Sequence, residues 1–206
     1  MPQLTLFDTS EAVLADDDRG RVTYMPGVVD AATAQAWFDE LRRDIPWRAE
    51  RRVMYDREVD VPRLIGHFRL DPPPRSAPAA ILAAAHTVAG RVDAPFNSVG
   101  LNLYRDGRDS VAPHNDHLNE LRSGFPIALL SLGATRRMTI RAKAAPPRVI
   151  HVDLESGSLL VMSYATQIHY THGVPKTGAA VGERISLAFR VKRARDGSAG
   201  DARYGP

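Results

Sequence analysis

The chain of 206 residues contains no cysteine, and this absence removes several classes of site at once. Disulfide bonds, thiolate metal sites and cysteine nucleophiles are all excluded. Any metal ion must therefore be held by histidine, aspartate or glutamate side chains. No apolar run approaches the length of a membrane-spanning helix, and the start of the chain lacks the basic and apolar segments of a signal peptide. We expect a cytoplasmic protein without a membrane partner.

The chain also has little net charge, +3 at pH 7, which permits an anionic partner without requiring one. Hydrophobic residues make up 44% of the sequence, and the length suits a single domain with a substantial core. Residues 1–20 are polar and become acidic toward Asp16–Asp18, so we expect them to form a flexible N-terminal arm. We expect a monomer with one domain over 21–193 and a flexible tail over 194–206.

Two helices are predicted in the first part of this domain, residues 21–96. Asp30 is a suitable N-cap for a helix that runs to about Arg43. Ser76 is expected to cap a second helix, with Pro78 in its first turn and Gly90 near its end.

The second part of the domain, residues 97–193, is predicted to consist of short strands separated by glycine, proline and aspartate turns. This pattern favours a sandwich or barrel, so we predict an α+β protein with a jelly-roll core and two N-terminal helices packed on it. The expected strands lie near 98–105, 127–132, 137–142, 148–154, 158–163 and 184–192.

An H-x-D triplet, His114-Asn115-Asp116, is the first candidate site. Side chains two apart on an extended segment point the same way, so His114 and Asp116 would face one point. A further histidine would complete a two-histidine, one-carboxylate triad, which suits Fe(II) and leaves coordination positions open. His172 is the preferred third ligand. His169 is a competing candidate, but three residues away on a strand it would face the opposite side.

Arg184 and Arg190 are six residues apart, so they lie on one face of a predicted strand. A 2-oxo acid that chelates the iron needs a buried cation for its distal carboxylate. Arginine suits this role because its planar fork binds a carboxylate in two places and keeps its charge, so Arg184 and Arg190 are both expected to bind the co-substrate. Asn102 and Tyr104, two apart on the preceding strand, are expected to add neutral donors to the same co-substrate site.

The segment from Trp47 to Arg69 carries six arginines around Tyr55. Arginines interleaved with an aromatic residue suit a phosphate backbone and a stacked base, but a solvated strand pair with balancing acids explains the pattern equally well. His117 could line the pocket beside the metal ligands. Arg137 and its basic neighbours (Arg136, Arg141 and Lys143) could contact nucleic acid or form a solvated strand face.

The chain resembles the AlkB family of Fe(II)/2-oxoglutarate-dependent dioxygenases from about Trp47 to Arg193. The matching segments come in the family's order: N-x-Y within Asn102–Gly107, H-x-D at His114–Asp116, L-S-L-G at Leu130–Gly133, G-S-L-L-V-M at Gly157–Met162, the distal histidine His172, and R-x5-R at Arg184–Arg190. The resemblance implies a double-stranded β-helix that uses Fe(II), 2-oxoglutarate and O2. It implies the oxidative removal of alkyl groups from nucleobases of the 1-methyladenine and 3-methylcytosine type in DNA, with release of formaldehyde, succinate and CO2.

The expected substrate contacts are Tyr55, Arg63, His117 and Arg137. Val61–Arg63, with Tyr55 upstream, resembles the branch of the family that acts on duplex DNA. In that branch an aromatic residue wedges into the base stack while the damaged base flips out.

Two departures from the family pattern concern the substrate rather than the iron. His117 and Leu118 stand where many members place an acidic residue near the base, and Asp56 or Glu120 could replace that acid. The tyrosine-rich stretch expected after the wedge region is missing, since the chain reads Phe68-Arg69-Leu70-Asp71-Pro72. RNA, a protein or a small molecule is therefore an alternative substrate to DNA. A third hypothesis, a binding module that has lost catalysis, is disfavoured by the complete triad.

Overall fold

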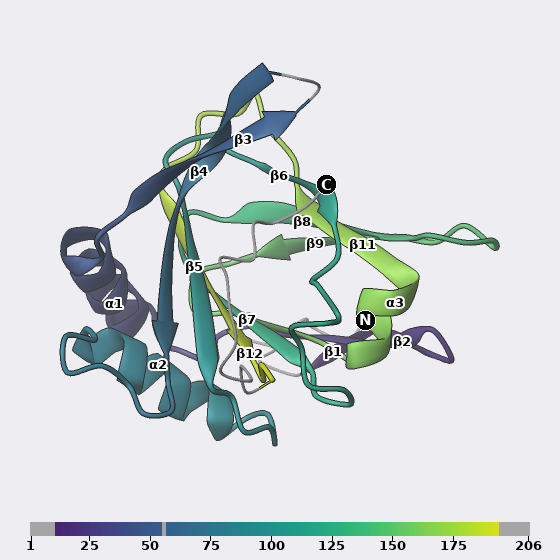
Figure 1. Cartoon of the computed structure of the whole chain (residues 1–206), viewed down its shortest axis with the longest axis horizontal. Coiled ribbons are helices and arrows are strands. Elements are labelled where there is room, and N and C mark those ends of the chain that lie inside the picture. The colour runs from purple at the N-terminus through teal and green to yellow at the C-terminus, as the bar shows by residue number, and fades with distance from the viewer. Residues whose placement is uncertain (1–10, 55–56, 194–206) are drawn as a thin grey trace, which may run out of the picture.

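The computed structural model describes residues 11–54 and 57–193, with side chains throughout these ranges except at residues 51–60. Two β-sheets face each other, and two of the three helices in the described part lie against the outer face of the larger sheet (Figure 1). This arrangement confirms the predicted α+β jelly roll with two N-terminal helices. No helix in the described part combines the length and apolar character that a membrane crossing would require.

The larger sheet has eight strands in the order β1-β2-β10-β7-β12-β5-β4-β3. Its neighbouring strands are antiparallel throughout. In chain order these strands are β1 (Ala12–Asp17), β2 (Gly20–Met25), β3 (Arg48–Met54), β4 (Arg57–Arg69), β5 (Ser98–Tyr104), β7 (Ile127–Gly133), β10 (Leu159–Met162) and β12 (Arg184–Arg190).

The smaller sheet has four antiparallel strands in the order β6-β11-β8-β9. They are β6 (Val111–His114), β8 (Arg136–Ala142), β9 (Val149–Leu154) and β11 (Tyr170–Val174). The chain passes from one sheet to the other between β5 and β6, and back between β6 and β7, and this alternation builds the double-stranded β-helix.

The alternation of side chains along β12 separates two cores. Ile185, Leu187 and Phe189 belong to the cluster that packs under the helices, whereas Ala188 belongs to the cluster between the sheets. Because residues two apart share a face, Arg184 and Arg190 point into the space between the sheets with Ala188. The predicted inward orientation of both arginines follows from this register.

Helices α1 (Ala31–Asp44) and α2 (Ala79–Ala89) cover the outer face of the larger sheet. The Asp30 side chain accepts a hydrogen bond from the Thr33 backbone N–H at 3.0 Å, which confirms its predicted capping role. The expected cap at Ser76 is wrong: α2 begins after Pro78, whose own side chain makes no capping hydrogen bond. The Glu40 side chain of α1 accepts a hydrogen bond from the Ala80 backbone N–H at 3.0 Å instead, and the fixed φ of Pro78 also favours the start of a helix.

The N-terminal arm is shorter than predicted, because its second half forms β1 and pairs with β2. Ion pairs tie this edge of the sheet to its neighbours: Arg21 contacts Asp16 at 2.7 Å, and Arg148 contacts Asp17 at 2.8 Å. The run of acids read as a sign of disorder is therefore matched by basic partners that lie elsewhere in the sequence. Residues 1–10 and the expected tail, 194–206, lie outside the described part.

Candidate metal centre and co-substrate pocket

Three predicted ligands meet between the two sheets. One ligand atom from each of His114, Asp116 and His172 lies within 4.8 Å of the other two. The two imidazole rings have centroids 4.5 Å apart and are tilted by 53°. Two neutral imidazoles and one carboxylate at this separation form a donor set that suits a divalent first-row metal such as Fe(II).

The pairing of β6 with β11 brings the two histidines together, since His172 lies directly opposite His114 in the register. The adjacent Gly173 allows the strands to approach closely. A Cβ atom at this position would lie 2.8 Å from the Val111 carbonyl oxygen and 3.0 Å from the Pro113 nitrogen. The prediction that the H-x-D triplet is fully extended was only partly correct, because β6 ends at His114 and Asp116 follows in the loop.

Both histidines are prepared to act as neutral ligands. The Nδ1 atom of His114 lies 3.0 Å from the Ala112 carbonyl oxygen, so Nδ1 carries the proton and Nε2 remains available to a metal. Desolvation lowers the pKa of His114, and burial lowers the pKa of His172 to about 3. An imidazole that stays neutral keeps the lone pair that metal coordination requires.

Arg190 holds the carboxylate of Asp116 from the opposite sheet. Its Nε and Nη2 atoms donate to the two carboxylate oxygens at 2.5 Å and 3.2 Å. Burial alone would raise the pKa of Asp116, but the charge and hydrogen bonds of Arg190 outweigh it and keep that pKa well below its usual range. Asp116 is therefore ionised and fixed in orientation, as a metal ligand must be.

Arg184 lies fully buried at the other end of β12, and its Nη2 donates to the Ser131 hydroxyl at 2.8 Å. Its Nε and Nη1 atoms are buried without a hydrogen-bond partner in the described structure. Burial lowers the pKa of Arg184. Two unsatisfied donors on one buried guanidinium are what a carboxylate would satisfy, so this pocket fits the distal carboxylate of 2-oxoglutarate.

Tyr104 and Arg136 close the same end of the pocket. The buried Tyr104 ring lies opposite Arg184 in the register, with the Arg184 guanidinium carbon 5.1 Å from its centroid. The guanidinium carbon of Arg136 lies 5.5 Å from the same centroid. Arg136 donates to three backbone carbonyls, those of Asp106, Asp109 and Pro175. We expected Arg136 to contact nucleic acid or to lie on a solvated strand face, whereas it adds a second buried positive charge here.

Asn102 lies on the same inward face as Tyr104, with its side-chain oxygen accepting a hydrogen bond of 2.7 Å from the Nε of Arg63. Arg63, expected to contact substrate, is thus joined through Asn102 to the strand that carries the co-substrate pocket. The backbone also connects here, because the Ser110 N–H donates to the Pro62 carbonyl at 2.8 Å. The base of the β3–β4 hairpin therefore adjoins the segment that leads into the metal ligands.

The structure does not bring every predicted contact into the site. Arg137 lies three residues from Ile140, which is paired with His172, so it faces away from the ligands and forms an exposed ion pair with Asp153 at 2.8 Å. Tyr55 lies outside the described residues. His117 follows Asp116 in the loop and is half-buried. Its backbone oxygen accepts a hydrogen bond from Glu120.

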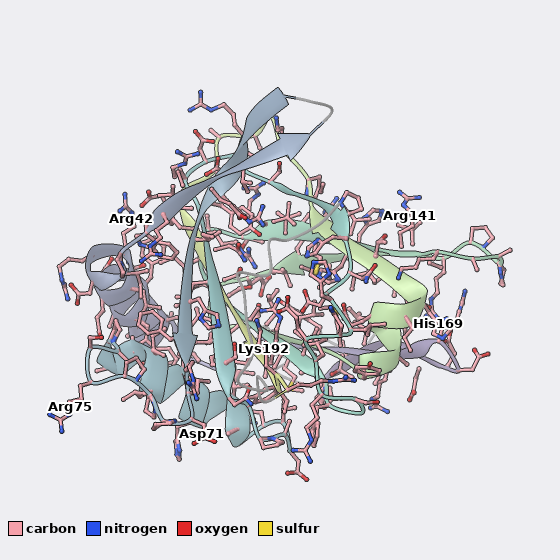
Figure 2. The ribbon with its side chains drawn as sticks, viewed as in Figure 1. Arg42, Asp71, Arg75, Arg141, His169 and Lys192 are labelled. Carbon is pink, nitrogen blue, oxygen red and sulfur yellow. The ribbon has the colours of Figure 1, made fainter. Side chains whose placement is uncertain are left out.

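His169 ends helix α3 (Tyr164–His169), is half-buried, and does not belong to the ligand group (Figure 2). The structure thus groups His172, the preferred third ligand, with His114 and Asp116. The reason that His169 is apart differs from the expected one, since His169 is helical rather than on the opposite face of a strand. Glu120, a candidate substitute for the missing acid, pairs with Lys192 at 2.9 Å. The other candidate, Asp56, lies outside the described residues.

A family model described as the 2OG-Fe(II) oxygenase superfamily matches residues 21–190. The chain belongs to this superfamily. It is an AlkB homologue, 33% identical over 189 residues to alpha-ketoglutarate-dependent dioxygenase alkB homolog 3 of Bos taurus, across 83% of this chain and 66% of the relative. The human counterpart is 30% identical, across 88% of this chain and 69% of its own length. The chain thus spans about two thirds of the length of these relatives.

Human DNA oxidative demethylase ALKBH2 is 37% identical over 110 residues, across 50% of this chain and 42% of the relative. Among solved structures, OsALKBH1 superposes with a TM-score of 0.55 at 15% identity, across 82% of this chain and 97% of that chain. A 2OG-Fe(II) oxygenase family protein from Burkholderia pseudomallei gives a TM-score of 0.55 at 16% identity, across 82% and 84%. These two structures confirm the fold.

The AlkB homologue is therefore an Fe(II)- and 2-oxoglutarate-dependent dioxygenase that consumes O2, as the resemblance in sequence implied. His114, Asp116 and His172 are the residues that fit the iron, and Arg184 with Ser131 and Tyr104 fits the co-substrate.

Proposed function

We propose that this dioxygenase removes alkyl groups from N-alkylated nucleobases of the 1-methyladenine and 3-methylcytosine type in DNA, and so repairs alkylation damage. The observation that carries the proposal is similarity to alkB homolog 3 over most of the chain, 83% of it for the Bos taurus relative and 88% for that of Mus musculus. Named relatives include a DNA oxidative demethylase.

When bound at the triad, Fe(II) supplies the activation of O2 that is coupled to decarboxylation of 2-oxoglutarate. The protein's own residues bind and orient the reactants. Arg184 and Ser131 fix the distal carboxylate of 2-oxoglutarate at the closed end of the pocket. Arg190 fixes Asp116, and the apolar side chains between the sheets (among them Leu129, Met138 and Ile140) exclude water.

The overall chemistry places one oxygen atom of O2 in succinate and the other in the alkyl group. Hydroxylation of an N-methyl group gives a cationic hemiaminal. Its hydroxyl group loses a proton and its C–N bond breaks, which releases formaldehyde and returns the bonding electron pair to the ring nitrogen of the unmodified base. The balance is one O2 and one 2-oxoglutarate consumed for each succinate, CO2 and formaldehyde formed. The leaving nitrogen of these lesions is part of a cationic ring, which makes it a good leaving group at neutral pH.

The hairpin of β3 and β4 is the element best placed to receive nucleic acid. It extends beyond the body of the molecule at one end of the two sheets (Figure 1). Its base lies against the segment before β6 and reaches Asn102 through Arg63. A long basic hairpin at the mouth of a buried site suits a duplex backbone from which one base is turned inward.

A second candidate is hydroxylation or demethylation of RNA, a protein or a small molecule. Leu118 in place of an acidic residue favours it. The basic residues in and beside β8 also favour it, because three of them are engaged within the protein rather than left for a DNA backbone. Arg136 donates to backbone carbonyl oxygens, Arg137 donates to Asp153, and Lys143 donates to carbonyl oxygens at the end of α3. Arg141 is exposed, as Arg137 and Lys143 are, and projects from the surface of the molecule (Figure 2).

The test is a matched set of oligonucleotides of one sequence, each carrying a single 1-methyladenine. They are offered as single-stranded DNA, duplex DNA and RNA, together with an unmethylated DNA strand, in the presence of Fe(II), 2-oxoglutarate and air. Mass spectrometry of the digested product reports adenine in place of 1-methyladenine. Asp116→Ala is the control, because it removes a metal ligand and leaves the hairpin unchanged.

The proposal requires loss of the methyl group from DNA by the wild-type enzyme and no loss with Asp116→Ala. Demethylation of RNA alone would move the function to the second candidate. Succinate formed at the same rate with and without every oligonucleotide would refute a nucleic-acid substrate, since it would show an active iron centre indifferent to the base.

A further inference from the structure

A buried amide, Gln167, contacts the metal-binding loop from outside the ligand set. Its side chain is fully buried on helix α3, and its Oε1 accepts a hydrogen bond from the backbone N–H of Asp116 at 3.1 Å. Its Nε2 donates to the Thr166 hydroxyl at 3.2 Å, which fixes which end of the amide faces the loop. Nothing in the pairing of the strands requires a polar residue at this position.

The contact replaces a hydrogen bond that the sheet no longer supplies. His114 pairs with His172, so an antiparallel continuation would set Asp116 opposite Tyr170. β6 ends at His114 and β11 begins at Tyr170, so the ladder stops before that pair forms. The Asp116 N–H turns instead to Gln167. A backbone donor at a buried loop needs such a partner, because an unsatisfied N–H would be costly there.

Gln167 is itself firmly held, and the same segment carries a ligand. The Nζ of Lys143 donates to the carbonyl oxygens of Gln167 at 3.0 Å and Ile168 at 2.9 Å, which satisfies the C-terminal end of α3. Helix α3 runs directly into β11, so His172 follows only five residues after Gln167. One side chain thus connects the segment that carries His172 to the loop that carries Asp116.

We propose that Gln167 is a positioning residue that sets the place of the Asp116 carboxylate relative to His172, and so tunes the affinity of the triad for its divalent metal. Arg190 controls the carboxylate oxygens, while Gln167 fixes the backbone from which the carboxylate projects. Partners of this outer kind typically change metal affinity by about 10-fold to 100-fold when they are removed.

Three substitutions distinguish the effect of the hydrogen-bond acceptor of Gln167 from the effect of its side-chain volume. Gln167→Met keeps the volume and loses the acceptor, and Gln167→Asn keeps the amide but is too short to reach. Both are expected to weaken Mn(II) binding to the full-length, metal-free protein by about 10-fold, measured by the electron paramagnetic resonance signal of unbound Mn(II). Gln167→Glu keeps an acceptor of the same reach and is expected to retain most of the wild-type Mn(II) affinity.

Ile168→Ala is the matched control, because Ile168 lies on the same helical turn with its side chain 45% exposed. It is expected to bind Mn(II) as the wild type does. Thermal unfolding of each variant reports whether the fold is intact, and 2-oxoglutarate turnover at saturating metal reports kcat. A positioning role predicts that excess metal restores much of kcat, whereas general misfolding would lower it at every metal concentration.

Wild-type Mn(II) affinity in either folded variant, Gln167→Met or Gln167→Asn, would overturn the proposal and reduce Gln167 to a residue that fills space. Equal losses in Gln167→Glu and Gln167→Met would also overturn it, since the acceptor would then have no part. Should Gln167→Met fail to fold, Gln167→Asn and Gln167→Glu decide the matter by the same comparison.

Discussion

Arg184 illustrates how a single residue can prepare a site for its co-substrate. A guanidinium buried with two unsatisfied nitrogens costs free energy in the free protein. A carboxylate of bound 2-oxoglutarate that accepts a hydrogen bond from this guanidinium would offset part of that cost. The pocket therefore exchanges some stability of the empty protein for affinity and for a fixed co-substrate orientation.

Arg184→Met is expected to abolish stabilisation by 2-oxoglutarate. In the wild-type protein with Mn(II), a 100-fold excess of 2-oxoglutarate over its Kd should raise stability by about 2.7 kcal/mol. That gain corresponds to a rise in Tm of about 5 to 10 °C for a chain of this size. The variant loses the charged hydrogen bonds and should show little shift, as measured by differential scanning fluorimetry.

The same experiment tests the cost of the empty pocket. Free Arg184→Met is expected to unfold at a Tm no lower than that of the wild type, because methionine replaces a buried, incompletely paired charge. A Tm shift with 2-oxoglutarate as large as that of the wild type would contradict the assignment of this pocket.

For individual residues, the sequence was sufficient to predict which polar side chains gather between the sheets. The even spacing of Arg184 and Arg190 and the order of the histidines predicted a triad that the structure brings together. Gln167 and Arg136 escaped prediction, because each acts through backbone atoms of segments distant in sequence. A single sequence contains no pattern that marks such contacts.

The contact between β6 and β11 determines the distance between the two histidines, and Gly173 allows it. Gly173→Ala would place a Cβ 2.8 Å from the Val111 carbonyl oxygen, which belongs to the backbone and cannot move without shifting β6. We expect a loss of about 1–3 kcal/mol in unfolding free energy and about a 10-fold loss in Mn(II) affinity. Chemical denaturation and Mn(II) titration measure the two effects.

Gly178→Ala is the control for this prediction, since a Cβ there meets no atom within 4 Å. It should match the wild type in both measurements. If Gly173→Ala also matched the wild type, close packing of the two strands would not be what holds the histidines together.

Tyr55, the expected wedge, lies outside the described residues and falls in the sequence between β3 and β4. Tyr55→Ala is predicted to lower kcat/KM on duplex DNA by about 10-fold or more, because stacking of a base on an aromatic ring contributes about 1–3 kcal/mol. The effect on single-stranded DNA should be smaller, since no neighbouring pair must be held open. Tyr55→Phe keeps the ring and should retain duplex activity, and equal losses on both substrates would argue against a wedge.

Among the elements, the sequence predicted the strands that have strong turn signals at both ends. It did not predict elements that form only because residues distant in sequence pair with them. Strands β5, β7, β8, β9, β10 and β12 and helix α1 lie within a few residues of their expected places. β1 was read as an arm because its acids suggested a solvated segment, yet basic partners elsewhere neutralise them. α3 is too short for a helical period to show.

The whole molecule has a net charge of only +3, so binding to DNA must come from local arrangement rather than from overall charge. If the basic hairpin contacts several phosphates, log Kd for an oligonucleotide should rise linearly with log salt concentration, with a slope of about 0.9 per phosphate on duplex DNA. Asp116→Ala should keep this slope, because the metal centre contacts the base rather than the backbone. A Kd independent of salt would contradict binding through phosphates.

We propose that the triad, the Arg184 pocket and the hairpin act together on one N-alkylated base. The most direct measurement is the ratio of succinate to formaldehyde released from 2-oxoglutarate and a DNA strand that carries 1-methyladenine, in the presence of Fe(II) and air. We expect a ratio near one, with both products dependent on the methylated base and absent in Asp116→Ala. Succinate without formaldehyde, at a rate unaffected by the methylated strand, would contradict it.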